Sequence, residues 1–357
     1  MLKLLFLSTP VGPLGSGVGG GVELTLFNLA KEMNRRGHQV KIVAPQHSSL
    51  PNITCQEIPG VWQDMVQNST RDAPIILLQN SVLANMWNFA KEVENDYDLI
   101  VNFAFDWLPL YLTPFFKRTI AHLISMGSTT DAIDSMIHQV AKSFPYTIGV
   151  HTQEQAKTFP FLENFYILGN GIDISLYEFC DNPSNDFSWI GRISPEKGLE
   201  DAILAAKDAN VKLKVFGKIQ DIEYWKNIQV DYSNADFQYE GFFSTEKLQE
   251  KIRTSKAILV TPKWVEAFGN VIIESLACGV PVIAYKRGGP AALVKHGETG
   301  FLVTPDSVNE LVYAINNIGE INRERCRHQA EINYSLQVLG DRFEKWMLML
   351  NKINKSK

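Results

Sequence analysis

The sequence is poor in the features that mark disulfide-linked, metal-binding or membrane-spanning proteins. Its four cysteines in 357 residues lie far apart, with no Cys-x-x-Cys pair and no Cys/His ligand spacing. We therefore expect reduced thiols in a cytoplasmic protein and no zinc site. The cysteines are Cys55, Cys180, Cys278 and Cys326. No run reaches the ~18 apolar residues of a spanning helix, and the apolar stretch 1–8 is too short for a signal peptide, so it is expected to form a buried strand.

Positive charge is also scarce. The formal net charge is −5, which argues against nucleic acid as a partner. The first 170 residues hold more acidic than basic side chains, which argues against docking on anionic lipid. Low-complexity segments and short repeats are absent. The remaining composition, 45% hydrophobic and 20% charged, is that of a globular protein whose length predicts two domains.

Short apolar runs alternate with amphipathic stretches along the chain. Helical spacing marks residues 22–33, 248–255 and 343–350. The expected strands are residues 4–8, 40–44, 75–78, 99–104, 119–124 and 146–150, followed by 187–191, 211–217, 257–261, 281–285 and 301–303. Alternation of strand and helix predicts an α/β protein with parallel sheets and right-handed crossovers.

The two series of strands predict two Rossmann-like, doubly wound domains in tandem, facing across a cleft. The turn-rich segment 170–184 is the candidate linker. We place the first domain at 1–168, the second at 169–335 and a C-terminal helix at 336–357. Ligands of open parallel sheets bind outside the carboxyl ends of the strands, so residues that directly follow strands are the candidate site residues.

The first candidate is a glycine-rich run, 12–23, between the first expected strand and the first expected helix. Glycines allow close approach of a ligand to the backbone, and a helix N-terminus offers N–H groups to an anion. Gly15, Gly17 and Gly20 match a dinucleotide fingerprint, but the second strand ends at Gln46 without the acidic residue that such a site requires. The run is therefore predicted to contact a phosphate or a substrate, with a plain surface loop as the alternative.

The second candidate is the loop after the first strand of the second domain, which carries Arg192 and Lys197. A guanidinium fork and an ammonium point charge at this place suit a diphosphate. The alternative is a solvated loop with ordinary surface cations.

The third and most specific candidate runs from Glu266 to Gly279. Gly269 is predicted to open a helix that Gly279 closes. Glu274 then lies in the middle of an apolar helix, where a carboxylate is costly unless it has a partner. A sugar diol would supply one; a structural salt bridge with Arg192 or Lys197 is the alternative. The glycines of segment 286–290, after the next strand, again allow close backbone approach.

The order of these motifs resembles glycosyltransferase family 4. The shared pattern is Gly-Arg-x4-Lys-Gly, then Glu-x7-Glu with Phe-Gly inside it, then Ala-Cys-Gly-x-Pro-Val, Gly-Gly-Pro and Gly-x-x-Gly-Phe-Leu-Val, with Asn-Gly-Ile-Asp at the domain junction. The resemblance covers nearly the whole chain. It implies a GT-B fold in which the second domain holds a nucleotide-sugar donor, the first domain binds the acceptor, and the C-terminal helix packs back on the first domain.

The resemblance also implies roles for individual residues. Arg192 and Lys197 would bind the donor diphosphate, Glu274 the ribose hydroxyls, and Glu266 the hexose. Backbone N–H groups would assist along Phe268, Gly269, Asn270 and Val271. His122, at the end of an expected strand, matches the position of a histidine near the transferred sugar, with a satisfied core histidine as the alternative.

The family implies transfer with retention of anomeric configuration and with no metal or other cofactor. Asp96 and Asp98 form the only Asp-x-Asp pair, but they precede a strand and are expected at the amino end of the sheet, away from the ligand. No covalent nucleophile is evident. The resemblance suggests a front-face mechanism in which the donor phosphate assists deprotonation of the acceptor.

The glycine-rich segment, including Gly19, Gly20, Gly21 and Glu23, is similar to the tetrahydrobiopterin (pteridine) glucosyltransferases of this family. That similarity implies UDP-glucose as donor and an α-glucoside of the pterin side chain as product. The aromatic side chains of Phe105 and Trp107 would stack on the pterin ring and Asp106 would pair with its N–H groups, unless the aromatics only pack in the core.

Other acceptors and other functions stay open at this stage. A lipid-linked or polysaccharide sugar is the alternative acceptor, although the acidic first domain weighs against a membrane-bound one. A nucleotide-sugar 2-epimerase and a non-catalytic nucleotide-sugar sensor are the alternative functions. The first would need ring-acting acids and bases that the sequence does not reveal, and the intact set of candidate residues weighs against the second.

Overall fold

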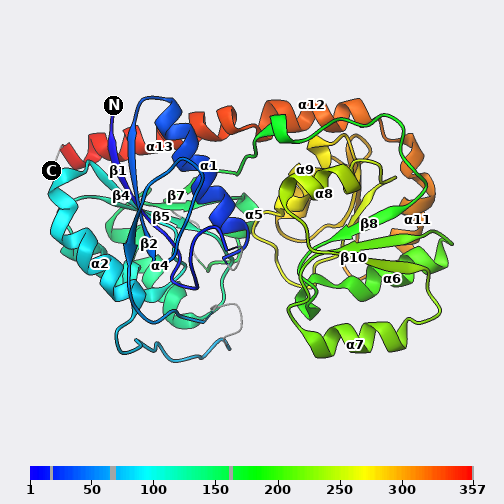
Figure 1. Cartoon of the computed structure of the whole chain (residues 1–357), viewed down its shortest axis with the longest axis horizontal. Helices are drawn as coiled ribbons and strands as arrows, with labels where there is room; N and C mark the ends of the chain where they lie inside the picture. Colours follow the sequence, from blue (N-terminus) through cyan, green and yellow to red (C-terminus); the bar gives the residue numbers. More distant parts are fainter. Residues whose placement is uncertain (17–18, 65–69, 161–163, 356–357) are drawn as a thin grey trace. The chain divides into compact units, whose positions relative to one another are not determined.

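The computed structural model describes every residue except 17–18, 65–69, 161–163 and 356–357. The chain folds into two compact units. Unit 1 comprises Met1–Asn170 together with Leu336–Lys357, and unit 2 comprises Gly171–Ser335. Each unit is an α/β structure built on a parallel sheet (Figure 1).

Unit 1 contains a seven-stranded sheet in the order β3-β2-β1-β4-β5-β6-β7, with every neighbouring pair parallel. Its strands are β1 (Lys3–Leu7), β2 (Gln39–Pro45), β3 (Cys55–Ile58), β4 (Leu99–Asn102), β5 (Ile120–Ile124), β6 (Ile148–Val150) and β7 (Phe165–Ile167). The winding direction reverses between β1 and β4. In an open α/β sheet this switch point is where a ligand is expected.

Helices cover both faces of this sheet. They are α1 (Gly21–Arg35), α2 (Val82–Val93), α3 (Trp107–Leu112), α4 (Asp131–Ser143), α5 (Gln153–Ala156) and α13 (Leu336–Lys355). The C-terminal helix α13 lies beside α1 (Figure 1). The predicted apolar face of α13 is buried there, because Phe343, Trp346 and Met347 pack with Leu26 and Leu29 of α1.

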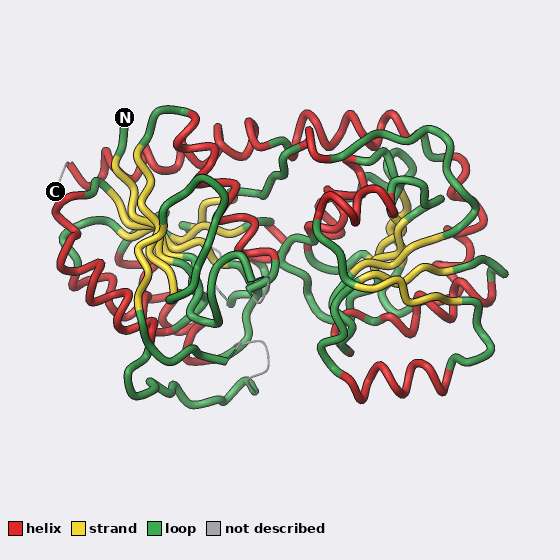
Figure 2. The backbone as a smooth tube through the Cα atoms, in the orientation of Figure 1, coloured by secondary structure: helices red, strands yellow, loops and turns green. Residues whose placement is uncertain are grey.

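Unit 2 contains a six-stranded sheet in the order β10-β9-β8-β11-β12-β13, again parallel throughout. The strands, drawn in yellow, lie side by side with helices, drawn in red, around them (Figure 2). The strands are β8 (Phe187–Ile190), β9 (Leu213–Phe216), β10 (Phe237–Gly241), β11 (Ile258–Val260), β12 (Val282–Tyr285) and β13 (Gly300–Val303). The switch point lies between β8 and β11, the strands that precede the two most specific motifs of the sequence.

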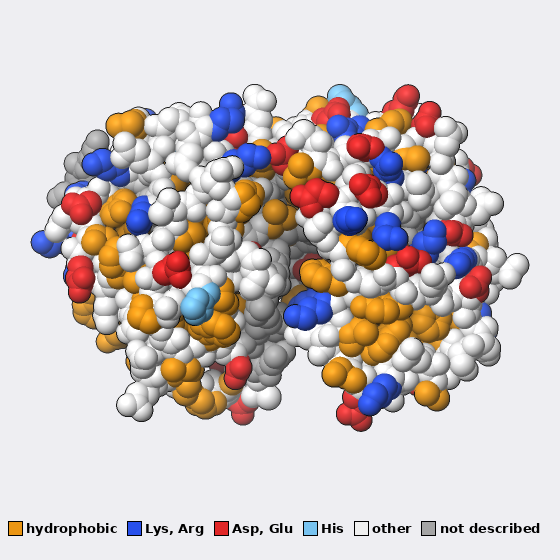
Figure 3. All heavy atoms as spheres, viewed as in Figure 1, with side chains coloured by type: hydrophobic (Ala, Val, Ile, Leu, Met, Phe, Trp, Pro, Cys, Tyr) orange, Lys and Arg blue, Asp and Glu red, His pale blue; other side chains and the backbone are white. Residues whose placement is uncertain are grey.

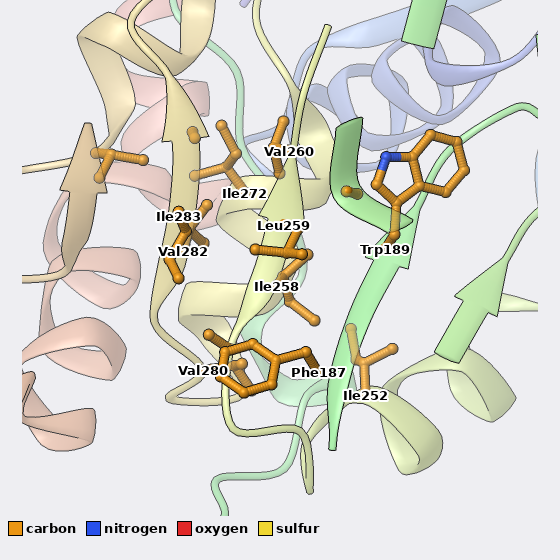
Figure 4. Close-up of a cluster of buried hydrophobic side chains, with 14 of the residues drawn as sticks. Phe187, Trp189, Ile252, Ile258, Leu259, Val260, Ile272, Val280, Val282 and Ile283 are labelled. Carbon is orange, nitrogen blue, oxygen red and sulfur yellow. The ribbon is translucent and has the colours of Figure 1, made fainter. Parts of the chain in front are cut away.

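The helices of unit 2 pack on both faces of its sheet. They are α6 (Leu199–Asp208), α7 (Ile222–Asp231), α8 (Thr245–Ile252), α9 (Asn270–Ala277), α10 (Gly289–Leu293), α11 (Val308–Asn317) and α12 (Arg323–Tyr334). The core between sheet and helices is apolar, as Figure 4 shows for Phe187, Trp189, Ile258, Val282 and their neighbours. This core fixes the strand ends that carry the candidate site.

The largest difference from the expected strands is at residues 75–78, which form a loop and not a strand. Ile75, Ile76 and Leu77 are 46%, 66% and 59% exposed, so the apolar run does not enter the core. Conversely, strands β3, β7 and β10 were not predicted from the sequence. All three are edge strands, which are covered on fewer sides and therefore need fewer apolar residues.

No described helix of the chain combines the length and the hydropathy that a membrane-crossing helix requires. Basic and acidic side chains are interspersed over the face drawn in Figure 3. All four cysteines are free thiols, and the two most deeply buried, Cys278 and Cys326, have pKa values raised to about 12 by burial.

Candidate active site

The candidate residues of unit 2 gather at the carboxyl edge of its sheet. Arg192 and Lys197 follow β8, and Glu266 follows β11, the neighbouring strand across the switch point. Because both strands are parallel, their carboxyl ends meet at one edge, and the two loops lie side by side. The sequence analysis anticipated this placement from the positions of the motifs.

Gly198 and Thr261 join the two loops. Gly198 has a left-handed φ of 64°, and a Cβ atom built there would stand 2.1 Å from the carbonyl oxygen of Thr261. The Thr261 hydroxyl donates to the Gly198 carbonyl at 2.7 Å and accepts from the Trp189 indole at 3.2 Å. A glycine is therefore required at the end of the Arg192–Lys197 loop, and its close approach fixes that loop against β11.

Lys197 and Glu266 form an ion pair across these loops. The indole of Trp264 donates to the same carboxylate at 3.2 Å, and the Lys197 ammonium also lies over the Trp264 ring, 4.8 Å from its centre. Burial alone would raise the pKa of Glu266, but Lys197, Trp264 and the charge of Arg192 together lower it below its usual value. Glu266 is thus ionised at neutral pH and oriented by two donors.

Arg192 is held by neutral and acidic partners at the same edge. Its Nη1 donates to Gln220 Oε1 at 2.9 Å, and its Nη2 lies 3.2 Å from Glu196 Oε1. Glu196 also accepts from the Ser194 hydroxyl at 2.8 Å. The guanidinium is therefore braced by the loop after β9 as well as by its own loop.

Glu274 lies in the middle of α9 on a partly buried face. Its Oε1 accepts from the hydroxyl of Tyr177 at 3.4 Å, and burial raises its pKa to about 7. The alternative of a salt bridge with Arg192 or Lys197 does not apply to this carboxylate, whose described partner is Tyr177. A partly buried acid with one long hydrogen bond is suited to accept further donors from a ligand.

The helix boundaries predicted for this segment are confirmed. Gly269, with a left-handed φ of 99°, is the N-cap residue of α9, and Gly279, with a φ of 76°, follows its C-cap. No side chain caps the N-terminus of α9 through a hydrogen bond. Phe268 is 5% exposed and packs in the core, so its ring is not open to a ligand.

The glycine pair after β12 has a different role from the one expected. The Gly289 N–H donates to the Glu266 carbonyl at 2.6 Å, and Cβ atoms built at Gly288 and Gly289 would stand 2.4 Å from the Glu266 oxygen and 1.9 Å from the Phe268 oxygen. The close backbone approach is real, but its partner is the Glu266–Phe268 loop. These glycines therefore position Glu266.

In unit 1, the glycine-rich run encloses a carboxylate of its own. Glu23 is 8% exposed and accepts from the backbone N–H groups of Gly15 at 2.9 Å and Gly19 at 2.5 Å. Gly20 is the N-cap residue of α1, which begins at Gly21, and Gly17 lies outside the described residues. The N–H groups of this run were predicted to bind a phosphate or a substrate, but two of them donate to the carboxylate of Glu23 instead. Glu23 lies in the first turn of α1.

The segment after β4 does not form an aromatic slot. Phe105 is 7% exposed and packs in the core with Leu110 and Ile124. Trp107 stacks on Tyr111, with ring centres 4.6 Å apart and planes 14° apart. Asp106 is the N-cap residue of α3 and accepts from Leu108 at 2.9 Å, and burial raises its pKa. Phe105 and Trp107 therefore do not form the expected pair of rings for stacking on a ligand. Phe105 is a core residue, and Trp107 stacks on Tyr111.

His122 differs most from its expected position. It is the third of five residues in β5, fully buried, and not at the strand end. Its Nδ1 lies 3.2 Å from Asn102 Nδ2 and its Nε2 lies 2.9 Å from the Thr113 hydroxyl. Burial lowers its pKa to about 3, so the ring is neutral at physiological pH. Both ring nitrogens have hydrogen-bond partners within the protein. His122 therefore fits the alternative of a core histidine whose hydrogen bonds are satisfied.

Other described residues bear on the chemistry of the site. Asp98 accepts from the backbone N–H of Lys3 at 2.8 Å, which places the Asp-x-Asp pair at the amino ends of β1 and β4. No cluster of three metal-ligating side chains occurs in the described part of the chain. The sequence analysis missed Tyr177, Trp264 and Gln220, because the contacts that give them a role appear only when the strand ends meet.

Comparisons with known proteins agree with this architecture. Residues 180–335 match the family "Glycosyl transferases group 1", and residues 19–129 match "Glycosyltransferase Family 4". Sucrose synthase 2 from Pisum sativum is 31% identical over 103 residues, which are 27% of this chain and 13% of that protein. The uncharacterized glycosyltransferase MJ1178 from Methanocaldococcus jannaschii is 28% identical over 161 residues, 45% of each chain. The chain thus matches less than half the length of these two relatives.

Solved structures match nearly the whole chain at low sequence identity. HepE from Anabaena, in complex with UDP and glucose, has a TM-score of 0.76 at 20% identity, covering 97% of this chain and 99% of its own. Sucrose-phosphate synthase from Thermosynechococcus elongatus has a TM-score of 0.76 at 17% identity, covering 98% and 99%. The fold is shared with these proteins. The chain therefore has the GT-B fold, and the family models that match its two parallel-sheet units both describe glycosyltransferases.

Proposed function

We propose that the protein is a retaining glucosyltransferase that moves glucose from UDP-glucose to a hydroxyl of a small acceptor and forms an α-glycoside. The observation that carries this proposal is the cluster of Arg192, Lys197 and Glu266 at the switch point of unit 2, with Glu274 on the adjoining helix. The Anabaena HepE structures, which share the fold, contain UDP, UDP-glucose, or UDP with glucose. These names favour a uridine donor.

Each residue of the cluster has a role that its chemistry suits. Arg192 and Lys197 bind the diphosphate through a guanidinium fork and a point charge. The backbone at Gly269, Asn270 and Val271 opens α9, whose N-terminus carries partial positive charge that favours a phosphate. Glu274 accepts from the ribose hydroxyls, and Glu266 accepts from hydroxyls of the glucose.

The proposed reaction is a front-face displacement at the anomeric carbon. The bond from that carbon to the β-phosphate oxygen breaks, and the acceptor oxygen forms its bond on the same face. The acceptor proton passes to the departing phosphate oxygen, and UDP leaves. Arg192 and Lys197 stabilise the negative charge that develops on the diphosphate, which is the largest contribution expected from such a site. His122 has no part in this scheme, because both its ring nitrogens are occupied within the core.

We assign acceptor binding to unit 1 and propose tetrahydrobiopterin as the first acceptor to test. Asp106 has one oxygen engaged with Leu108, which leaves its other oxygen to accept from an N–H group of a pterin. A sugar acceptor is the second candidate, since sucrose-phosphate synthase and the lipopolysaccharide galactosyltransferase WaaB share the fold. We further propose that the enzyme acts in the cytoplasm and needs no metal.

The deciding experiment is a donor and acceptor screen read by mass spectrometry. UDP-glucose incubated with tetrahydrobiopterin should yield a pterin-hexose adduct and UDP. The coupling constant of the anomeric proton should be that of an α-glycoside. A β-glycoside would contradict retention, and turnover only on a different alcohol would remove the pterin. If UDP-glucose is neither bound nor consumed, the proposed function itself fails.

A further inference from the structure

Trp264 lies beside the ion pair of the candidate active site, and the proposed function has given it no role. It is partly exposed in the loop between β11 and α9, two positions before Glu266. Its indole N–H donates to Glu266 Oε2 at 3.2 Å, and the Lys197 ammonium lies over its ring, 4.8 Å from the ring centre. One side chain thus contacts both members of the ion pair.

The backbone around Trp264 is anchored on both sides. The N–H of Lys263 donates to the carbonyl of Glu196 at 2.9 Å, and the carbonyl of Glu266 accepts from the N–H of Gly289 at 2.6 Å. Neither hydrogen bond involves a charged group of the ion pair. The position of the indole is therefore set by the fold of the loop, whether or not the ion pair is intact.

The two donors to the Glu266 carboxylate meet at one oxygen. Lys197 and Trp264 both reach Oε2, and the described residues supply no donor to Oε1. The side chain of Glu266 is 19% exposed, so the carboxylate is accessible to a ligand. Oε1 is thus the oxygen that accepts from a hydroxyl of the glucose, while the contacts at Oε2 hold the carboxylate in place.

A bound diphosphate acts differently on these two donors. The Lys197 ammonium is a point charge on a flexible stem, and the negative charge of the diphosphate attracts it away from the carboxylate. The indole of Trp264 is neutral, has a single N–H and turns about only two side-chain bonds. The diphosphate therefore has little hold on it. With a donor bound, the Trp264 N–H is the contact that remains at Oε2.

The same hydrogen bond supports the charge of Glu266. Burial opposes ionisation of this carboxyl group, whereas Lys197, Trp264 and the charge of Arg192 lower its pKa. A diphosphate neutralises the two cations, so the indole is the one of these three contributions that persists. A hydrogen bond donated to the carboxylate favours its ionised form.

We propose that Trp264 is a positioning residue whose indole N–H keeps the Glu266 carboxylate oriented while a donor occupies Lys197. This inference rests on the proposed function, which gives Glu266 its role toward the glucose. Trp264 acts through Glu266 and touches neither the glucose nor the diphosphate in this scheme. Its loss should therefore slow glucose transfer without weakening the binding of UDP.

The hydrogen bond itself is followed by NMR in the full-length protein labelled with ¹⁵N-tryptophan. Trp264→Phe identifies the Trp264 signal among the seven indole signals, and Glu266→Ala gives its position when the carboxylate is absent. Saturation with UDP should leave the wild-type signal closer to its unliganded position than to its position in Glu266→Ala. The opposite result would overturn the proposal, because the indole would then leave Glu266 together with the ammonium.

The positioning role is measured by comparing UDP affinity with the turnover of UDP-glucose. Trp264→Phe keeps an aromatic ring beside Lys197 but lacks the N–H. Its UDP affinity should be unchanged and its turnover about tenfold lower, the loss expected for a hydrogen bond to a charged group. Trp225→Phe is the matched control in the same unit, because Trp225 lies on α7 and packs against aromatic rings of β10. It should leave both quantities at their wild-type values, and melting temperatures show that each variant is folded.

The outcomes separate this inference from the proposed function. If Trp264→Phe turns over UDP-glucose like the wild type, or loses affinity for UDP in parallel with turnover, the positioning role is wrong and the proposed function stands. If the wild-type protein neither binds UDP nor consumes UDP-glucose, the proposed function fails and the positioning role fails with it.

Discussion

Lys197 and Glu266, which follow neighbouring strands on the two sides of the unit 2 switch point, form an ion pair with each other. The proposed function gives them different targets, the diphosphate and the hexose. Without a donor, Lys197 and Glu266 therefore pair with each other. A bound donor would replace this pairing, because the diphosphate would contact Lys197 and the hexose would contact Glu266. Replacing Lys197 should therefore lower the affinity for UDP, whereas replacing Glu266 should not. Measurements of UDP binding can thus distinguish the roles of the two residues.

Lys197→Ala should weaken UDP binding tenfold or more. A hydrogen bond to a charged group is worth about 1.5–3 kcal/mol, and the substitution removes one cation from the diphosphate. Isothermal titration calorimetry with UDP measures the change, and Lys207→Ala, on α6, serves as a matched control of equal charge. If Lys197→Ala and Arg192→Ala both bind UDP like the wild type, the diphosphate assignment is wrong.

Glu266→Gln should bind UDP at least as tightly as the wild type while transferring glucose much more slowly. The amide no longer neutralises Lys197, so the ammonium is available to the diphosphate, but the glucose loses a charged acceptor. UDP titrations and initial rates of UDP release from UDP-glucose give the two readouts. A parallel loss of UDP affinity would mean that Glu266 serves to orient the cation site and not to contact the sugar.

Glu274→Gln should make the unliganded protein more stable at pH 8 but not at pH 4. Burial raises the pKa of Glu274 from 4.5 to about 7, so between these values the folded state binds more protons than the unfolded state. The free energy of unfolding therefore falls as the pH rises through this window, by up to about 3 kcal/mol. Glutamine cannot ionise, so Glu274→Gln should not lose this part of the free energy of unfolding as the pH rises. Thermal unfolding of both proteins at pH 4 and pH 8 measures the difference.

The same residue should give UDP binding a pH dependence. Ribose hydroxyls donate to the ionised carboxylate, so wild-type affinity should rise as the pH increases through about 7. Glu274→Gln should bind more weakly at pH 8 and lack this step. The titration of the UDP phosphate is common to both proteins and cancels in the comparison. An identical pH profile in the two proteins would show that Glu274 does not touch the ribose.

The cluster in unit 2 could be predicted from the sequence because it depends on local order. In a parallel sheet every strand end lies at one edge, so Arg192, Lys197 and Glu266 were expected at the same edge once β8 and β11 were recognised. That β8 and β11 are neighbours in the sheet is shown by the structure. The direct pairing of Lys197 with Glu266 was not predictable in the same way. It depends on the close approach of Gly198 to Thr261, a contact between segments more than sixty residues apart.

Unit 1 was less predictable for physical reasons. A histidine at the end of a strand and a histidine inside a strand look the same in a sequence. Only the position of β5 in the structure shows that Asn102 and Thr113 are the hydrogen-bond partners of the two His122 ring nitrogens. The run 75–78, of which residues 75–77 are exposed, has the apolar pattern of a strand but no neighbouring strand to pair with. The ion pair of Arg71 with Asp134 was not predictable either, because Arg71 reaches Asp134 from a loop 63 positions earlier and no spacing rule connects such residues.

Gly289→Ala tests whether the glycine pair positions Glu266. A Cβ atom at Gly289 would stand 1.9 Å from the backbone oxygen of Phe268, so the loop that carries Glu266 has to move away from α10. Overpacking of this kind costs about 1–3 kcal/mol. We therefore expect a lower melting temperature and a slower glucose transfer.

Gly319→Ala is the matched control, because a Cβ atom there meets nothing within 4 Å and its φ is not in the left-handed region. It should leave both the melting temperature and the rate at their wild-type values. If Gly289→Ala lowers stability but leaves the Michaelis constant and the turnover of UDP-glucose unchanged, the glycine serves the fold alone. A loss of turnover that exceeds the loss of folded protein, measured at a temperature where both variants are folded, assigns the contact to the placement of Glu266.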